Sequence, residues 1–353
     1  MIGRKFPLIL LLTFVALVAC SQETVQTSNG SEANGDETLS STGSESISLN
    51  MATLSQGSSW YVYGATMASI LQDEVDEINR VDVLPYSGGY GNVDLLDNGE
   101  ADIALTFNLN NLWAYNGDNG YEQKYENIRA LVGGMDKYYV GIVMTNEFVD
   151  RYDITSIADI KEKEIPIRLL TVNRGSQGEM AARQILEVYG LDYDTIKSYG
   201  GSVEHTSFDV VQSSIQDGRG DMFIQVMTEG HPAFTEIAIQ TPVTFISVED
   251  EYLEKLREYG YVKNILPPNV YNGQDYEVQS PGLSTTLTTT TELSEDLAYA
   301  ITKALAENKE RLVDGHNALS YYIPEEGLHP DNIGRIPLHP GAEKYYQEKG
   351  WLE

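Results

Sequence analysis

Two kinds of hydrophobic pattern alternate along the chain from Ile47 onward. Short apolar, β-branched runs predict buried strands, and segments with apolar side chains three or four residues apart predict helices. Their alternation is typical of α/β proteins with mostly parallel sheets. The expected strands are Ile47–Ala52, Val81–Pro85, Ile103–Phe107, Val140–Thr145, Ile167–Val172, Met222–Val226 and Val243–Val248. The expected helices are Trp60–Ile78, Asn92–Leu96 with Asn92 as its cap, Gln177–Tyr189, Phe208–Gln216 and Glu295–Arg311 with Ser294 as its cap.

One order of loops and elements occurs twice. A Gly/Ser loop at residues 55–59 opens the first long helix, and Gly99, 42 residues after Gly57, precedes a strand. A second loop at residues 174–178 opens another helix, and Gly218, 42 residues after Ser176, again precedes a strand. We interpret this repeat as two lobes of like topology. Chance recurrence of common α/β loop residues would give the same order, and the sequence leaves that alternative open.

Two such lobes would face each other across a cleft. Open α/β sheets bind ligands beyond the carboxyl ends of their strands, and both repeated loops follow expected strand ends. The free N–H groups and the dipole at a helix start favour carboxylates. We therefore expect a small anion to bind between the lobes.

The first twenty residues form a separate segment. Arg4 and Lys5 precede an apolar run from Phe6 to Ala19, and Cys20, the only cysteine, follows. The run is shorter than the ~20 residues that span a bilayer. This order predicts a signal peptide at residues 1–19, cleaved before a lipidated Cys20; a plain secretory signal with an incidental cysteine is the alternative. Residues 20–46, poor in large apolar side chains, predict a disordered linker after the lipid.

The length, the single cysteine and the net charge exclude several classes of function. Removing the first 19 residues leaves 334, which suits two domains of ~100–200 residues each. With Cys20 lipidated, no thiol is left for disulfides, cysteine-ligated zinc or thiol catalysis. The formal charge of −30, or −32 without Arg4 and Lys5, opposes binding to nucleic acid and to anionic lipid. Such a protein must hold an anion through local donors rather than net charge.

Catalytic signatures are weak. The chain shows no His-Glu-x-x-His, no Gly-x-Ser-x-Gly, no Walker loop and no Rossmann fingerprint. The five histidines are scattered without ligand spacing. We therefore predict a binding protein with no catalytic residues, no metal and no cofactor. An α/β lipoprotein hydrolase would need a nucleophile–base pair that the sequence does not display.

Several motifs resemble those of the TAXI family, the substrate-binding lipoproteins of tripartite ATP-independent periplasmic (TRAP) transporters. Residues 336–350, Ile-Pro-Leu-His-Pro-Gly-Ala-Glu-Lys-Tyr-Tyr-Gln-Glu-Lys-Gly, are similar to that family's ending almost throughout. Residues 175–179 are similar to its Gly-Ser-Gly-Thr-Glu loop, although Glu179 stands directly after Gly178 without the usual Thr. The glycine-rich first loop of the family is here residues 54–61, which keep Gly57 and an aromatic pair. Further pieces in the family's order are Gly88-Gly89 with Asn92, Gly99-x-x-Asp102, Ala114–Gly117, Gly230–Pro232 and Pro267–Tyr271.

The resemblance implies a two-lobed periplasmic-binding-protein-like fold. Each lobe would be a mixed, mostly parallel sheet flanked by helices, with the ligand cleft between the lobes. From strand placement we expect lobe 1 at residues 47–136 plus 281–353 and lobe 2 at 137–280. The two lobes would close on the ligand by a hinge at the crossing segments near Val140 and Pro281.

The function implied is that of an extracytoplasmic solute receptor. It would capture a dicarboxylate or an acidic amino acid such as glutamate and deliver it to an ion-gradient-driven permease. The expected partners are this ligand, the membrane subunits of a TRAP permease and, through the lipid anchor, the membrane, with no nucleic acid and with the receptor itself a monomer. The alternative is a lipid-anchored sensor that docks on a signalling protein when loaded.

The candidate ligand-binding residues lie at expected strand ends and helix starts. In lobe 1 their donors would equally serve as ordinary helix caps. In lobe 2, Arg174 could pair with an anion or face solvent, and Glu229 would suit an ammonium group or sit on an exposed loop. The candidates are Gly57, Ser58, Ser59, Tyr61, Gly88, Gly89, Asn92 and Asn108 in lobe 1, and Arg174, Ser176, Gln177 and Glu229 in lobe 2.

Overall fold

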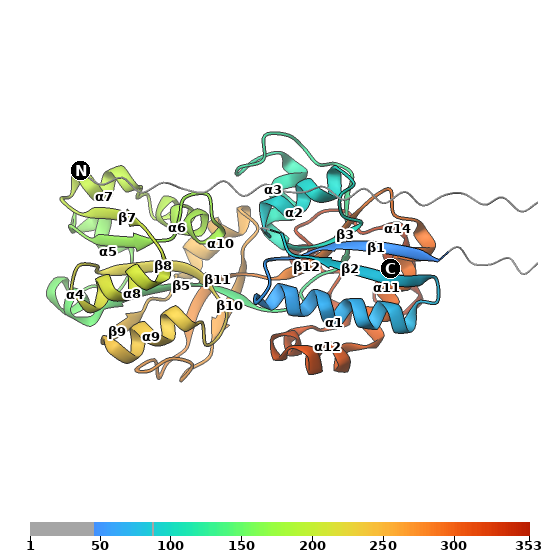
Figure 1. Cartoon of the computed structure of the whole chain (residues 1–353). Coiled ribbons are helices and arrows are strands. Elements are labelled where there is room, and N and C mark those ends of the chain that lie inside the picture. Colours follow the sequence, from blue (N-terminus) through green and yellow to red (C-terminus); the bar gives the residue numbers. More distant parts are fainter. Residues whose placement is uncertain (1–45, 87) are drawn as a thin grey trace, which may run out of the picture. The chain divides into compact units, whose positions relative to one another are not determined.

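The structure, a computed structural model, describes residues 46–86 and 88–353 (Figure 1). The predicted signal peptide, the lipidation site Cys20 and almost all of the predicted linker lie outside these residues. Within the described ranges no helix has the length and apolar character needed to cross a membrane. The same ranges contain no group of three or more His, Asp or Glu side chains placed to hold a metal ion.

The first sheet has five strands, and four of them come from the N-terminal part of the chain. Strand β1 pairs in parallel with β2 and β3, whereas β12 pairs antiparallel with β3 and β4. The strand order is β2 (Ile78–Leu84), β1 (Ile47–Ala52), β3 (Ile103–Phe107), β12 (Thr285–Thr290) and β4 (Ile128–Val132). Helices packed on or near it are α1 (Ser59–Glu74), α2 (Tyr90–Asp97), α3 (Asn108–Asn116), α11 (Glu295–Glu307), α12 (Lys309–Gly315), α13 (Pro330–Ile333) and α14 (Pro340–Glu348).

The second sheet has seven strands from the middle of the chain. Its order is β10 (Val262–Leu266), β11 (Val278–Leu283), β5 (Tyr138–Thr145), β8 (Met222–Met227), β6 (Arg168–Thr171) and β7 (Ser202–His205), with β9 (Val243–Phe245) paired to β5. Its helices are α4 (Asn146–Tyr152), α5 (Ala158–Glu162), α6 (Gln177–Val188), α7 (Tyr193–Ser198), α8 (Phe208–Gln216), α9 (Pro232–Gln240) and α10 (Asp250–Glu258). Two short 3₁₀ helices, η1 (Asn317–Tyr321) and η2 (Pro324–Glu326), follow α12.

The predicted fold class is confirmed: two mixed α/β sheets, each flanked by helices, form a two-lobed body. The expected predominance of parallel pairs is not seen, because β5, β11 and β12 pair antiparallel with their neighbours. A parallel pair needs a long crossover between its strands, usually a helix. Among the described residues, such helical crossovers connect β1, β2 and β3 in the first sheet and β6, β7 and β8 in the second. The predicted lobe boundaries stay a prediction, and Pro281 lies inside β11 of the second sheet.

Several predicted elements differ from the structure at their ends. The first long helix stops at Glu74, because Val75 is extended and Ile78 already pairs with Ile47 of β1. The last long helix breaks at Asn308, whose side chain donates to the carbonyl of Ala304 at 2.8 Å. The strands β4, β7, β10, β11 and β12 were not expected. Their polar or interrupted patterns resemble loops until a neighbouring strand covers them.

The sequence repeat corresponds to a repeated set of contacts. Asp102 accepts from the backbone N–H of Asn50 at 2.7 Å, and its own N–H donates to the carbonyl of Asn50 at 2.9 Å. Asp221 makes the same two bonds with Arg168, at 2.8 and 2.9 Å. In both cases the aspartate precedes one strand and bonds to a residue of a parallel neighbour, Asn50 within β1 and Arg168 at the start of β6. The two halves therefore share a local construction.

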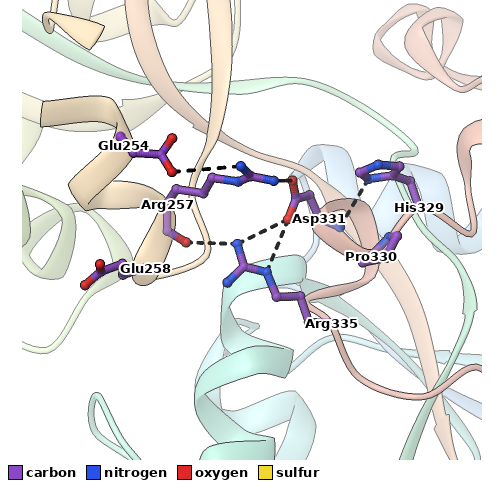
Figure 2. A pocket seen from close by; sticks show the side chains of 7 residues that line it. All are labelled: Glu254, Arg257, Glu258, His329, Pro330, Asp331 and Arg335. Carbon is purple, nitrogen blue, oxygen red and sulfur yellow. Dashed lines mark hydrogen bonds and ion pairs between the residues drawn. The ribbon is translucent and has the colours of Figure 1, made fainter. Parts of the chain in front are cut away.

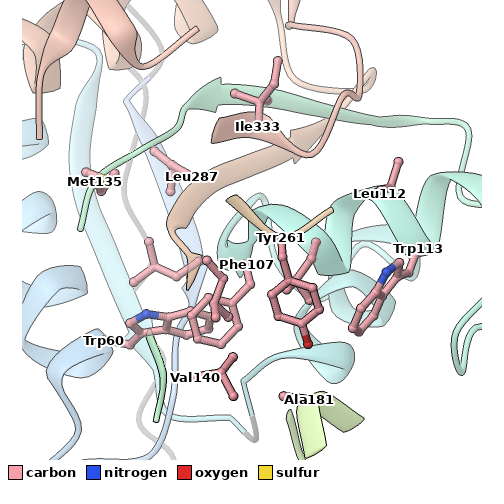
Figure 3. Packing of buried hydrophobic residues seen from close by; sticks show 14 of the residues in the cluster. Trp60, Phe107, Leu112, Trp113, Met135, Val140, Ala181, Tyr261, Leu287 and Ile333 are labelled. Atoms are coloured by element: carbon pink, nitrogen blue, oxygen red, sulfur yellow. The ribbon is translucent and has the colours of Figure 1, made fainter. Parts of the chain in front are cut away.

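The hydrophobic core continues from one sheet to the other. One cluster of buried side chains includes Trp60 and Phe107 from the first lobe together with Val140, Ala181 and Tyr261 from the second (Figure 3). The ring centroids of Trp60 and Phe107 lie 4.6 Å apart. Apolar side chains from both lobes thus share one cluster.

Candidate functional site

The two repeated loops open helices in the same way. Ser58 caps α1, with its Oγ accepting from the N–H of Tyr61 at 3.2 Å, and Ser176 caps α6, accepting from Glu179 at 3.4 Å. Gly57 and Gly175 have φ values of +89° and +78°, which glycine adopts at little cost. Because both hydroxyls are used as caps, what each loop offers a ligand is mainly the backbone N–H groups of the first turn, which have no partner within the helix.

A direct bond joins helix starts from the two lobes. Asn110 is buried in the first turn of α3, and its Nδ2 donates to Oε1 of Gln177, the first residue of α6, at 3.2 Å. The remaining amide atoms, Oδ1 of Asn110 and Nε2 of Gln177, are buried without a partner among the described residues. An unpaired buried polar group costs ~1–3 kcal/mol. A ligand with matching donors and acceptors would remove that cost.

A third helix start lies beside this pair. A Cβ atom placed on Gly89, which precedes α2, would lie 4.0 Å from Oδ1 of Asn110. On the other side Gly178 approaches Gln225 of β8 so closely that a Cβ there would lie 1.4 Å from Oε1 of that glutamine. A larger residue at position 178 would displace the end of the Gln225 side chain. The starts of α2, α3 and α6 therefore converge around amide side chains; we call Gly89, Asn110, Gln177 and Gln225 the amide cluster.

Two predicted asparagines are fully buried and donate to backbone carbonyls, although Oδ1 of Asn92 has no partner among the described residues. Asn92 is not the cap of α2, because the helix begins one turn earlier with Gly89 as its cap. Its Nδ2 instead donates to the carbonyls of Thr53 and Leu105, at 3.0 and 2.8 Å. Asn108 donates to the carbonyls of Gly260 and Asp331 and accepts from Ser284. It thereby links the end of β3 to segments of both lobes.

Glu229 lies in a separate group with two tyrosines. Its Oε1 accepts from the hydroxyl of Tyr139 at 2.9 Å and from that of Tyr321 at 2.5 Å. Burial, together with the nearby Glu229, raises the pKa of Tyr321 to about 12, so the phenol stays protonated and keeps donating. Glu229 is half-buried, and among the described residues no hydrogen bond to its Oε2 is found, so this oxygen could accept from a ligand ammonium group.

Arg174 lies on the exposed loop before α6. Its guanidinium is 5.9 Å from the ring centroid of Tyr193. Behind it Glu179 is buried, accepting from the N–H of Gly175 at 3.2 Å and from the Tyr193 hydroxyl at 3.0 Å. Burial, and next the charge of Arg174, lower the pKa of His205, whose Nε2 is 3.7 Å from Glu179. Arg174 thus belongs to the surface of this cluster.

An ion-pair network joins α10 and α13 across the two lobes (Figure 2). Asp331 contacts Nη2 of Arg257 at 3.0 Å and Nη2 of Arg335 at 3.2 Å, and Arg335 also donates to the carbonyl of Arg257. An open cavity of about 510 Å³ lies beside these residues. Since Asp331 already pairs with both arginines, we assign the network to contact between the lobes.

The structure thus distributes the sequence-predicted residues over several groups. Asn110 connects Gly89 to Gln177, whereas Gly57, Ser58, Ser59 and Tyr61 lie at the start of α1, and Glu229 and Arg174 lie in groups of their own. Gly88 packs against Leu54. Asn110, Gln225, Tyr139 and Tyr321 were not anticipated. A signal for Asn110 was present in the Asn-Leu-Asn-Asn run that directly follows the expected strand Ile103–Phe107.

Comparison with models of protein families identifies the family to which this chain belongs. A model of the NMT1-like family matches residues 51–350, most of the chain. The chain belongs to the NMT1-like family. NMT1-like proteins are of the periplasmic solute-binding type, and the matched range contains every strand of both sheets except the first four residues of β1.

Solved structures similar to this NMT1-like chain include MatC from Rhodopseudomonas palustris with bound malate, at 9% identity, coverage of 87% of this chain and 99% of MatC, and a TM-score of 0.47. A TctC solute-binding protein from Polaromonas has 11% identity, coverage of 77% and 88%, and a TM-score of 0.48. The aliphatic sulphonate-binding protein SsuA from Escherichia coli has 11% identity, coverage of 78% and 84%, and a TM-score of 0.42. At these values we draw no conclusion about the ligand from them.

Proposed function

We propose that this protein is the extracytoplasmic solute receptor of a TRAP transporter, of the TAXI type, and that it binds a small organic anion. The observation that carries the proposal is the amide cluster: helix starts from both lobes meet at Asn110 and Gln177, whose buried amide atoms lack partners among the described residues. Helix N-termini favour carboxylates. Amide side chains accept and donate hydrogen bonds without adding negative charge.

The TAXI assignment rests on the sequence. Residues 336–350 and the loop 175–179 carry its most specific resemblances, within a chain of the NMT1-like family. Delivery of the solute to an ion-gradient-driven permease follows from that assignment. A gene for a fused TRAP permease beside this one would support it, whereas a histidine kinase gene in that place would favour the sensor alternative.

Glu229 separates the two ligand classes. A dicarboxylate has no group for this carboxylate, whereas the ammonium of an acidic amino acid would pair with it. We therefore expect Glu229→Gln to weaken binding of glutamate, if that is the ligand, and to leave binding of succinate unchanged or improved.

A thermal-shift screen of organic acids and amino acids on the full chain tests the proposal. A ligand at 100 times its Kd should stabilise the protein by ~2.7 kcal/mol, and it should be recovered unchanged after incubation. Stabilisation by none of these compounds, or conversion of the bound compound into a new species, would contradict a receptor for organic anions.

Anchoring is tested independently of the ligand. We propose that the protein is held outside the cytoplasmic membrane by lipid on Cys20. Cys20→Ala should move the protein from the membrane fraction to the soluble fraction of the cell or medium. A variant that still fractionates with membranes after losing residues 1–19 would exclude the lipid anchor.

A further inference from the structure

A second cavity lies where the chain passes between the two sheets. Its volume is about 300 Å³. Lys137 precedes β5, Ser284 joins β11 to β12, and Lys309 begins α12. Asp136, Asn264, Tyr321 and Glu326 also line the cavity. None of these belongs to the amide cluster.

Two cations line this cavity without a carboxylate partner. The ion pairs among the described residues include neither Lys137 nor Lys309. Lys137 lies over the ring of Tyr321, 4.6 Å from its centroid. In a chain with 53 acidic and 23 basic residues, acidic groups are abundant, so two unpaired ammonium groups on one cavity are unexpected. These two lysines are the cationic groups of the cavity, whose lining also contains two carboxylates.

The neutral groups of the cavity include a donor without an acceptor. The Oγ of Ser284 is buried and has no hydrogen-bond partner among the described residues, and the residue is 5% exposed. A buried hydroxyl in this state is unfavourable unless a ligand oxygen completes it. By contrast, Asn264 already donates to the carbonyl of Tyr138 at 2.8 Å.

Two carboxylates also line the cavity, and neither neutralises the lysines directly. Asp136 is buried, and its two oxygens accept from the N–H and the Oγ1 of Thr285 at 2.8 and 2.9 Å. Glu326 is exposed to solvent. The lysines therefore keep hydrogen-bond donors available for an incoming anion.

We propose that this cavity binds a small divalent oxyanion between Lys137 and Lys309, with Ser284 as a further donor, at a site separate from the amide cluster. Two ammonium groups match two charged oxygens, and charge-assisted hydrogen bonds of this kind are the strong ones. An anion held here connects a crossing segment to α12. Its binding is thereby linked to the arrangement of the two lobes, and that linkage is reciprocal.

Isothermal titration calorimetry on the full chain tests the site with inorganic phosphate, sulfate and succinate as probes, each at constant ionic strength with chloride as the monovalent comparison. We expect at least one divalent probe to bind with 1:1 stoichiometry. Lys137→Gln and Lys309→Gln should each weaken it about tenfold or more, as expected for loss of a charged hydrogen bond. Lys303→Gln, an exposed lysine of α11 outside the cavity, is the matched control and should leave the affinity unchanged.

A variant of the amide cluster separates the two sites. Gln177→Met should retain binding of the same probe, because Gln177 does not line this cavity. Three outcomes would overturn the proposal: no divalent probe binds, both lysine variants bind as the wild type does, or Gln177→Met abolishes binding together with them. The last result would place the anion in the solute site.

Discussion

The Nδ2 of Asn110 lies 3.2 Å from Oε1 of Gln177, and this bond joins the first turn of α3 to the first residue of α6. The two residues are 67 positions apart and belong to different lobes. Each keeps one buried amide atom without a partner among the described residues. A solute bound between the lobes would contact α3 and α6 at once. We therefore expect the contacts of this pair to change when the lobes close on a solute.

Gln177→Met should weaken solute binding by about tenfold or more, because methionine keeps the volume but loses both amide functions. Stability without ligand should also fall, by about 1–3 kcal/mol, because the buried Nδ2 of Asn110 loses its acceptor, so affinity and unfolding are measured separately. Calorimetry with the solute found by the screen measures the effect. Gln216→Met, an exposed glutamine at the end of α8, is the control. Equal affinities in the two variants would remove Gln177 from the site.

Arg174→Ala tests whether the exposed arginine beside the α6 loop reaches the ligand. We expect a loss of roughly 1.5–3 kcal/mol in binding free energy if its guanidinium makes a charged hydrogen bond to a carboxylate. The dependence of affinity on salt should also become shallower. Unchanged affinity would assign Arg174 to the surface over Tyr193, where the structure shows it.

Asp221→Ala should destabilise the fold more than the equivalent change Asp102→Ala. Asp221 is buried and accepts from the backbone N–H and the Nε of Arg168, both at 2.8 Å, which predicts a loss of about 1.5–3 kcal/mol, towards the lower end because Arg168 is 39% exposed. Asp102 is exposed and makes only the bond to Asn50, which predicts about 1 kcal/mol. Urea unfolding compares them. Equal losses of unfolding free energy in the two variants would show that the ion pair between Asp221 and Arg168 adds nothing to the stability of the second lobe.

Asp136 makes stability depend on pH. Burial raises the pKa of this carboxyl from 3.8 to about 6 in the folded protein. The carboxyl therefore loses its proton more readily in the unfolded chain than in the folded protein. Above pH 6 this difference lowers the free energy of unfolding by roughly 3 kcal/mol. The loss disappears as the pH falls from about 6 to 4, because the carboxyl is then protonated in both states.

Asp136→Asn should isolate that effect. The asparagine cannot ionise, and it can still accept from the N–H of Thr285. Relative to this variant, the wild type should gain stability as pH is lowered from 7 to 4 in chemical-denaturation experiments. A difference in stability that does not change with pH would contradict a raised pKa.

Asp331→Asn should loosen contact between the lobes. The carboxylate bridges Arg257 and Arg335, whose side chains are 53% and 37% exposed, so each pair is worth only ~0.2–1 kcal/mol. Apparent affinity for the solute should fall by no more than about fivefold, and the difference should shrink in high salt. Asp217→Asn, which breaks a pair with Arg219 inside a single turn, is the control. A loss that persists at high salt would point to a role other than ion pairing.

Local sequence determined much of the fold. The limits of β1 and β3 and of α8, the cap at Ser294 and the repeat that ends in Asp102 and Asp221 follow from patterns within a few residues. Such features depend on backbone propensity, capping and the period of apolar residues, which neighbouring residues set.

Tertiary structure decided what no local pattern contains. Strands such as β7 and β10 exist because a neighbour supplies their hydrogen bonds, and Asn92 is a buried donor to two strand ends rather than a cap. Asn110 and Gln177 are far apart along the chain, and nothing in the sequence around either residue indicates that they lie close together in space. The sequence therefore determined which elements form and where helices start, whereas only the packing of the two lobes decided which of those starts meet, because contacts between lobes depend on the fold of the whole chain.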